Sequence, residues 1–218
     1  MGIYAIGDIH GCFDEWIDFK ERIEKMDESA QFILIGDIVD RGPKENDMIG
    51  WALKNITKTG KYRMLIGNHE YDRWQSERKP IRLSFYMRLP FYIDQTVGGK
   101  RFILVHSYLP DSVIKEDGSL KEQDELTAHE MFTIVWSRNL SPFVSLPGVT
   151  VVQGHNPTVF EDSFRLEDYS EDKLGRVYDM GNRINIDCGL VYKDLPGHRL
   201  AALRLEDMEV FYSDDLSK

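Results

Sequence analysis

The 218-residue sequence has few cysteines and no long apolar segment. The two cysteines, Cys12 and Cys188, cannot form the disulfide framework of a small secreted fold, so we expect a reducing compartment. No stretch approaches the roughly 20 apolar residues of a membrane span, and a predicted strand at 3–6 stands where a secretion signal would begin. These absences predict a cytoplasmic protein with no membrane partner.

Basic charge is also scarce, because 27 Lys and Arg stand against 37 Asp and Glu, a formal net charge of −10. A nucleic-acid backbone requires a basic surface, so we expect no nucleic-acid partner. A single phosphate can still bind where metal ions and a few arginines oppose the overall field. The sequence has no internal repeat, and its length predicts a single domain over residues 1–218.

Five short apolar runs each stop at a polar residue able to bind a metal or transfer a proton. The runs are 3–6, 32–35, 62–66, 102–105 and 151–154. They lead into GDIHG (7–11), GDIVDRG (36–42), GNHE (67–70), His106 and His155. Ligands of an open α/β sheet collect beyond the carboxyl ends of the strands, where residues distant in sequence meet. The repeated pattern therefore predicts one site along a sheet edge.

Helical periodicity separates the first three strands. One helix face is indicated by Trp16, Phe19, Ile23 and Met26. A second helix is predicted after Pro43, which suits a first turn, and its apolar face consists of Met48, Ile49, Ala52, Leu53 and Ile56. The order strand, helix, strand, helix, strand predicts parallel strands with right-handed crossovers.

The remainder of the chain has a weaker pattern. Residues 71–95 combine arginines with aromatics, which we interpret as a solvated helical face, and Gly98-Gly99 predicts a hairpin turn before a strand at 101–105. Polar insertions at 107–147 and 160–183 are expected to border a substrate cleft. Closing strands are predicted at 184–186, 200–205 and 210–212.

The residues at the strand ends are suitable ligands for a pair of divalent metal ions. Two ions about 3.5–4 Å apart can clamp a displacement at phosphorus, and they need a bridging carboxylate with further oxygen and imidazole ligands. Asp8 and His10 can reach one ion, and Asp37 is the natural bridge. The second ion would be completed by Asn68, His106 and His155.

Four further residues have the chemistry of catalysis and phosphate binding. His69, beside the ligand Asn68, can donate a proton to a departing alkoxide, with Asp40 holding its other ring nitrogen. Arg41 can grip two phosphoryl oxygens with its planar fork, and Arg138 is the candidate for a second clamp.

The motifs GDIHG, GDIVDRG and GNHE resemble those of metallophosphoesterases of the phosphoprotein-phosphatase type, in the small bacterial and phage branch. This resemblance, which extends to the later VHS, GH and NIDCG stretches, implies an α/β fold that is a four-layer αββα sandwich with two mixed β-sheets. It implies hydrolysis of phosphomonoesters by a metal-bridging hydroxide, with manganese in the site and iron or zinc as alternatives. It also implies the metal, catalytic and phosphate-binding roles assigned above.

Two positions depart from the protein-phosphatase pattern. The chain has His106-Ser107-Tyr108 where HGG is usual, and Ile66 where many members have arginine. The leading hypothesis is hydrolysis of phosphoserine or phosphothreonine in proteins or peptides, with small phosphorylated metabolites as further substrates. The alternative is a symmetrical dinucleoside-tetraphosphate hydrolase of the diadenosine tetraphosphate type, because that branch contains such enzymes. A metal-binding module without turnover is disfavoured, because metal binding alone does not require the catalytic residues His69, Asp40 and Arg41.

Overall fold

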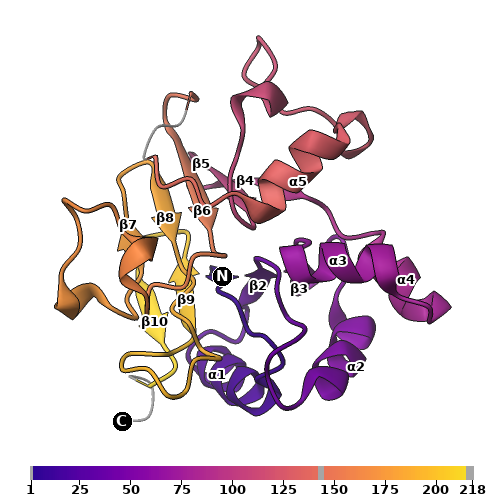
Figure 1. The fold of residues 1–218 in the computed structure, drawn as a ribbon, viewed down its shortest axis with the longest axis vertical. Helices are drawn as coiled ribbons and strands as arrows, with labels where there is room; N and C mark the ends of the chain where they lie inside the picture. Colours follow the sequence, from indigo (N-terminus) through magenta and orange to yellow (C-terminus); the bar gives the residue numbers. More distant parts are fainter. Residues whose placement is uncertain (1, 142–144, 215–218) are drawn as a thin grey trace.

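A computed structural model describes residues 2–141 and 145–214 of the chain, which form two five-stranded mixed sheets flanked by helices (Figure 1). The strand order is β10-β9-β1-β2-β3 in the first sheet and β4-β5-β6-β8-β7 in the second. The strands are β1 (Ile3–Ile6), β2 (Gln31–Leu34), β3 (Tyr62–Met64), β4 (Tyr92–Val97), β5 (Lys100–Val105), β6 (Val149–Gln153), β7 (Tyr178–Asp179), β8 (Arg183–Asn185), β9 (Ala201–Arg204) and β10 (Val210–Tyr212). The helices are α1 (Phe13–Met26), α2 (Glu45–Asn55), α3 (Asn68–Ser76), α4 (Pro80–Tyr86) and α5 (Ala128–Trp136), with 3-10 turns at Asp111–Val113, Gln123–Glu125, Glu161–Ser163 and Glu171–Lys173.

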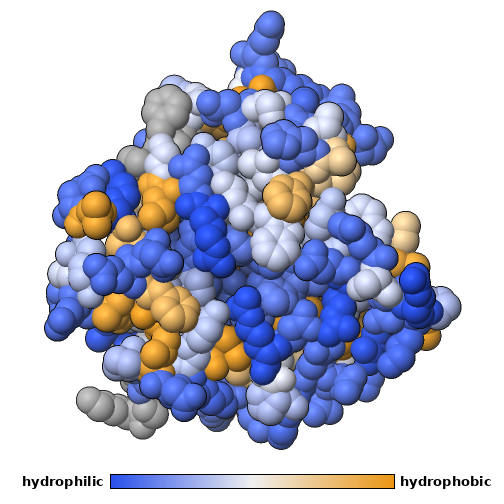
Figure 2. All heavy atoms as spheres, viewed as in Figure 1, coloured by the Kyte–Doolittle hydropathy of each residue, from blue (hydrophilic) through white to orange (hydrophobic). Residues whose placement is uncertain are grey.

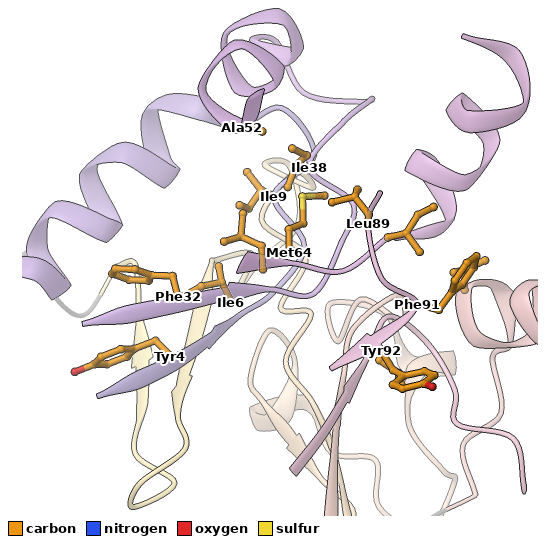
Figure 3. Close-up of a cluster of buried hydrophobic side chains, with 14 of the residues drawn as sticks. Tyr4, Ile6, Ile9, Phe32, Ile38, Ala52, Met64, Leu89, Phe91 and Tyr92 are labelled. Atoms are coloured by element: carbon orange, nitrogen blue, oxygen red, sulfur yellow. The ribbon is translucent and has the colours of Figure 1, made fainter. Parts of the chain in front are cut away.

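Alternate residues of a strand face opposite sides of the sheet, and here both sides are buried. On β1, Tyr4 and Ile6 pack with Trp16 of α1, whereas Ile3 and Ala5 pack in the layer between the two sheets. Strands buried on both faces are apolar at nearly every position, which explains the uninterrupted runs in the sequence. Figure 3 shows part of the outer layer, where Ile6, Ile9 and Met64 lie between the first sheet and the helix that carries Ala52.

The structure confirms the αββα arrangement predicted from the resemblance. The first three strands are parallel neighbours in the order β1-β2-β3, with α1 and α2 as the crossovers. The predicted closing strands correspond to β8, which lies one residue earlier than predicted, β9, which is one residue shorter at each end, and β10, which has the predicted bounds. No helix within 2–141 or 145–214 has the length and apolar character needed to cross a membrane.

The hairpin predicted at Gly98-Gly99 is confirmed, because it joins β4 to β5, but the bounds of β4 and the whole of β7 were not predicted from the sequence. β4 lies at the edge of its sheet, and between its buried ends Tyr92 and Val97 it carries the exposed residues Asp94 and Thr96. An edge strand with a solvent-facing side has no continuous apolar run, so its composition resembles that of a loop. β7 has only two residues, which is too short for any periodicity to appear.

Candidate metal centre

The carboxyl ends of five strands bring the six predicted metal ligands together. Asp8 and His10 follow β1, Asp37 follows β2, Asn68 opens α3 after β3, and His106 and His155 follow β5 and β6. All six side chains are buried, with at most 5% of any of these residues exposed to solvent. The end of β6 and the start of α3 lie on either side of the middle of the view in Figure 1, where Figure 2 shows mainly hydrophilic residues.

Asp37 occupies the central position. Its Oδ2 lies 3.5 Å from Nε2 of His10 and 3.5 Å from Nε2 of His106. It therefore belongs to two overlapping sets of donor atoms, one with His10 and His69 and one with His106 and His155. This geometry is suited to a carboxylate shared by two ions.

Hydrogen bonds fix the orientation of two of the imidazole rings. Nδ1 of His10 donates to the carbonyl oxygen of Val39 at 2.9 Å, and Nδ1 of His106 donates to that of Ile35 at 2.8 Å. A ring that donates through Nδ1 presents the lone pair of Nε2 to its other side, the usual arrangement for a metal-binding histidine. In both residues Nε2 faces Asp37.

The amide oxygen of Asn68 joins the last two histidines to this group. Its Oδ1 lies 3.0 Å from Nε2 of His106 and 2.8 Å from Nδ1 of His155. The backbone amide of His155 donates to Oδ2 of Asp8 at 3.3 Å. The six residues thus form one contiguous cluster of carboxylate, amide and imidazole donors.

The backbone at these strand ends is strained. Apart from Met208, the non-glycine residues with positive φ in the described ranges are His10 (47°), Asp37 (51°), Asp40 (63°), Arg41 (62°) and His155 (68°). Such conformations cost of order 1–3 kcal/mol each and concentrate where function requires a particular side-chain direction. Here each of the five positive-φ conformations belongs to a candidate site residue that follows the end of a strand.

Glycines in the motifs make room for the carboxylates. A Cβ atom on Gly67 would lie 2.2 Å from Oδ1 of Asp37, and one on Gly154 would lie 2.3 Å from Oδ1 of Asp8. No side chain fits at either position without displacing a donor atom. The glycines of GNHE and of the GH pair are therefore required by the close approach of neighbouring strand ends.

The electrostatics favour a neutral imidazole at His10 and His155, whereas at His106 burial is outweighed by Asp37, which raises the pKa of the ring. Burial lowers the pKa of His10 to about 4 and that of His155 to about 3, so both rings are neutral at pH 7. The neutral ring is the form that binds a metal ion. Burial opposes ionisation of Asp37, but His106 and His10 together lower its pKa below the usual range.

Negative charge accumulates around Asp8. Burial, together with Asp187 and Asp37, raises the pKa of Asp8, and burial raises that of Asp187 to about 6. Oδ1 of Asp8 and Nε2 of His155 are buried without a hydrogen-bond partner among the described residues. Buried carboxylates within electrostatic range of one another and donor atoms without a partner fit bound divalent cations, which would neutralise the carboxylates and accept the free lone pairs.

His69 lies at the rim of this cluster, and a hydrogen bond to Asp40 fixes its ring on the side away from the donor atoms. Its Nδ1 donates to Oδ2 of Asp40 at 2.7 Å, as the sequence predicted. Its Nε2 lies 3.9 Å from Oδ2 of Asp37. Asp40 also pairs with Arg73, and hydrogen bonds from Arg73 and His69 lower the pKa of Asp40 against the effect of burial.

This role of Arg73 differs from the prediction of a solvated face over 71–95. Residues 68–76 form α3, and Arg73 extends from it to the carboxylates of Asp40 and Glu45. An arginine pointing toward the site has the same local sequence signature as one pointing to solvent. The sequence therefore contained no signal for this contact.

The two predicted phosphate-binding arginines lie beside different histidines. Nη1 of Arg41 lies 2.9 Å from Nε2 of His10 and donates to the hydroxyl of Tyr192 at 3.1 Å. Nη1 of Arg138 donates to Oδ1 of Asn156 at 3.0 Å, and its charge contributes to the low pKa of His155. Both arginines are exposed, so an anion at the cluster can reach them.

Glu70 is a site residue that the sequence reasoning left without a role. It is fully buried, and its carboxylate accepts hydrogen bonds from the backbone amides of Asp37 (2.7 Å), Ile38 (2.9 Å) and Gly67 (2.9 Å). Burial and the charge of Asp37 raise its pKa to about 7. Glu70 thereby ties the GDIVDRG loop to the GNHE loop. The signal available was an acidic residue at the third position of a helix, typical of a capping box.

Four other polar or thiol-bearing residues have the following positions. Asp187 is buried and accepts from the amide of Gly189 at 3.0 Å, within electrostatic range of Asp8. His129 is exposed on α5, and His198 bonds the carbonyl oxygen of Leu195. Both cysteines are buried free thiols.

Comparison with known proteins identifies the family. The family model of the calcineurin-like phosphoesterases matches residues 1–185. The chain belongs to this family. The αββα sandwich and the donor cluster at the strand ends are therefore the framework of a metallophosphoesterase, and the chain is a metallophosphoesterase hydrolase.

Relatives with curated names match only part of the chain. A bis(5'-nucleosyl)-tetraphosphatase, symmetrical, of Salmonella paratyphi A is 37% identical over 70 residues, which is 32% of this chain and 24% of the relative. The corresponding protein of Nitrosococcus oceani is 39% identical over 74 residues, again 32% of this chain and 24% of the relative. The matched segment spans about a quarter of each relative's length.

Similar solved structures cover nearly the whole fold. A putative diadenosine tetraphosphatase has a TM-score of 0.56 at 17% identity, covering 97% of this chain and 92% of its own. A protein serine/threonine phosphatase from Saccharomyces cerevisiae has a TM-score of 0.59 at 13% identity, covering 97% of this chain and 78% of its own. At such identities the likeness supports the shared fold and leaves the substrate open.

Proposed function

We propose that the chain is a dimetal phosphatase that hydrolyses phosphomonoesters with poor leaving groups, foremost phosphoserine and phosphothreonine in proteins or peptides. The observation that carries the proposal is the pair His69–Asp40 at the rim of the donor cluster. An alkoxide leaves poorly unless it is protonated, so a positioned general acid is most useful for serine and threonine esters. A phosphate leaving group is more stable as an anion and needs less assistance.

The proposal includes two divalent ions, with manganese first and iron or zinc as alternatives. One ion would be held by His10 and Asp37 together with Asp8, and the other by Asp37, His106 and His155 together with Asn68, whose amide oxygen lies against both of these histidines. When bound, such ions neutralise phosphoryl oxygens and lower the pKa of coordinated water. Arg41 and Arg138 would bind the remaining phosphoryl oxygens as planar, permanently charged donors.

In this proposal His69 donates a proton from Nε2 to the departing oxygen, because Nδ1 is occupied by Asp40. The Asp40 carboxylate stabilises the protonated ring, and Arg73 fixes the position of Asp40. Asp40 and Arg73 are positioning residues. Glu70 has the same role for the loops that carry Asp37 and Asn68.

The test compares leaving groups within one variant. His69→Asn is expected to lower kcat for an alkyl phosphate or phosphoserine peptide by about 10²–10⁴-fold, with a much smaller effect on 4-nitrophenyl phosphate and none on metal content. His129→Asn is the matched control, because His129 is exposed on α5. Equal losses for both leaving groups would contradict a general-acid role.

Hydrolysis of a dinucleoside tetraphosphate is the second candidate, supported by the curated relatives and by an aromatic wall beside Arg41. Tyr192 contacts Arg41, and its ring meets Phe160 edge to face at a centroid distance of 4.8 Å. These residues line a cavity of about 480 Å³, in which a nucleobase could stack.

Turnover of a phosphopeptide and of diadenosine tetraphosphate at the same manganese concentration separates the two candidates. The first proposal expects the larger kcat/KM for the phosphopeptide. In contrast, a larger value for the tetraphosphate that Tyr192→Leu selectively reduces would establish the second.

A further inference from the structure

A larger cavity lies away from the metal centre. It has a volume of about 950 Å³ and lies between the edge strands β3 and β4 and the helices α3, α4 and α5. None of the predicted site residues lines it. Its size is at the upper end of the range of small-molecule sites, about 300–1,000 Å³. Figure 3 shows Met64, Leu89 and Phe91, three of its lining residues.

Most of the cavity wall is apolar and adaptable. Aromatic rings are contributed by Trp74, Phe85 and Phe91. Thioether side chains are contributed by Met64, Met87 and Met131. Methionine side chains are flexible and polarisable, so they fit apolar groups of varied shape. This wall is suited to the apolar body of a ligand.

One side of the wall carries positive charge. Arg63 on β3 is half-buried, and its Nη1 donates to the amide oxygen Oε1 of Gln95 on β4 at 3.0 Å. Within residues 2–141 and 145–214, Arg63 forms no ion pair with a carboxylate. Burial lowers the pKa of Arg63, as expected for a cation that lacks a neighbouring anion.

The other charged residues of the wall reinforce this imbalance. Lys58 and Arg88 also line the cavity, against a single carboxylate, that of Asp124. Three cations thus face one anion in a chain whose net charge is −10. A half-buried guanidinium beside an apolar cavity is stabilised when a ligand brings its own anion.

We propose that this cavity binds a small amphipathic carboxylate, with the anionic head at Arg63 and the apolar body against Trp74 and the three methionines. The assignment goes beyond the phosphatase reaction and does not depend on it. It names a class of ligand by its chemistry, an acyl-chain acid or a similar apolar carboxylate. Phosphate esters are unsuitable as probes, because they would also bind at the metal centre.

The first test is calorimetric titration of the metal-loaded protein with decanoate. Binding at one site is expected, and Arg63→Gln should weaken it about tenfold or more, the worth of one charge-assisted hydrogen bond. Arg63→Lys, which keeps the charge, should retain much of the affinity. Arg78→Gln is the matched control, because Arg78 is exposed and does not line the cavity. Decanol should bind more weakly than decanoate.

The second test locates the ligand in the wild-type protein. The chain has eight methionines, and methyl-labelled methionine gives one NMR signal for each. Decanoate should shift the signals of Met64, Met87 and Met131 and leave those of Met26 and Met48 unchanged. Absence of binding, equal affinity for decanol, equal affinity in Arg63→Gln or shifts confined to other methionines would each overturn the proposal.

Discussion

Glu70 is expected to contribute both to the free energy of unfolding and to metal affinity, and the substitution Glu70→Gln tests both contributions. One carboxylate oxygen accepts from the amides of Asp37 and Gly67, and the other accepts from those of Ile38 at 2.9 Å and Val39 at 3.3 Å. An amide side chain must turn its NH₂ group toward at least one of these N–H groups. The least costly orientation turns the NH₂ group toward the amides of Ile38 and Val39, so that the closer Ile38 amide is left buried without its acceptor and the longer Val39 bond is also lost.

An unsatisfied buried donor costs about 1–3 kcal/mol, so Glu70→Gln should lower the free energy of unfolding by about 2 kcal/mol. The loops it releases carry Asp37 and Asn68. Loss of a group that orients metal ligands typically lowers metal affinity 10–100-fold, and we expect a loss in this range. Urea unfolding of the metal-free protein measures the first effect, and manganese titration measures the second.

Glu130→Gln is the matched control. Glu130 is likewise a buried glutamate at the third position of a helix, where it accepts from the amide of Thr127 at 2.9 Å and from Lys121 at 2.7 Å. The control should lose stability and retain metal affinity. If Glu70→Gln binds manganese as tightly as the wild type, the reasoning that Glu70 holds the ligand loops is refuted.

Three further outcomes are expected. Asp37→Asn should lose at least one ion by elemental analysis, because both donor sets share this carboxylate, and full occupancy would contradict the bridge. Gly154→Ala should weaken metal binding, because the added Cβ would lie 2.3 Å from Oδ1 of Asp8. The control Gly50→Ala on α2, where an added Cβ meets nothing within 4 Å, should leave metal binding unchanged. Hydrogen bonds from Lys121 and from the Thr127 amide lower the pKa of Glu130 from 4.5 to about 2, so its contribution to stability is complete above about pH 4.5 and is lost as the pH falls toward 2. The difference in urea unfolding between wild type and Glu130→Gln should therefore shrink across this window, and a constant difference would contradict it.

The sequence was informative where burial forces a simple pattern. Strands β1, β2, β5 and β6 are buried on both faces, so each appears as an apolar run that ends at the site. The polar residue after each run then marks the carboxyl end of a strand. This is why five scattered donors could be assigned to one cluster before their contacts were known, and the sixth, Asn68, follows the apolar end of the run at β3.

Contacts between side chains from different elements left no such pattern. Arg73 pairs with Asp40, and Glu70 bonds the amide of Asp37; in both pairs the residues are 33 positions apart in the chain. Tyr192 contacts Arg41 across 151 positions. Each depends on the tertiary arrangement and on a side-chain direction. The bounds of the edge strand β4 were missed for the related reason that its exposed side is polar.

The central claim is that six donors converge on two cations, and anomalous scattering from crystals grown with manganese tests it most directly. The account predicts two manganese peaks, with Asp37 contacting both ions and the other ligands drawn from Asp8, His10, Asn68, His106 and His155. A single peak, peaks elsewhere on the chain or no peak at this cluster would contradict it.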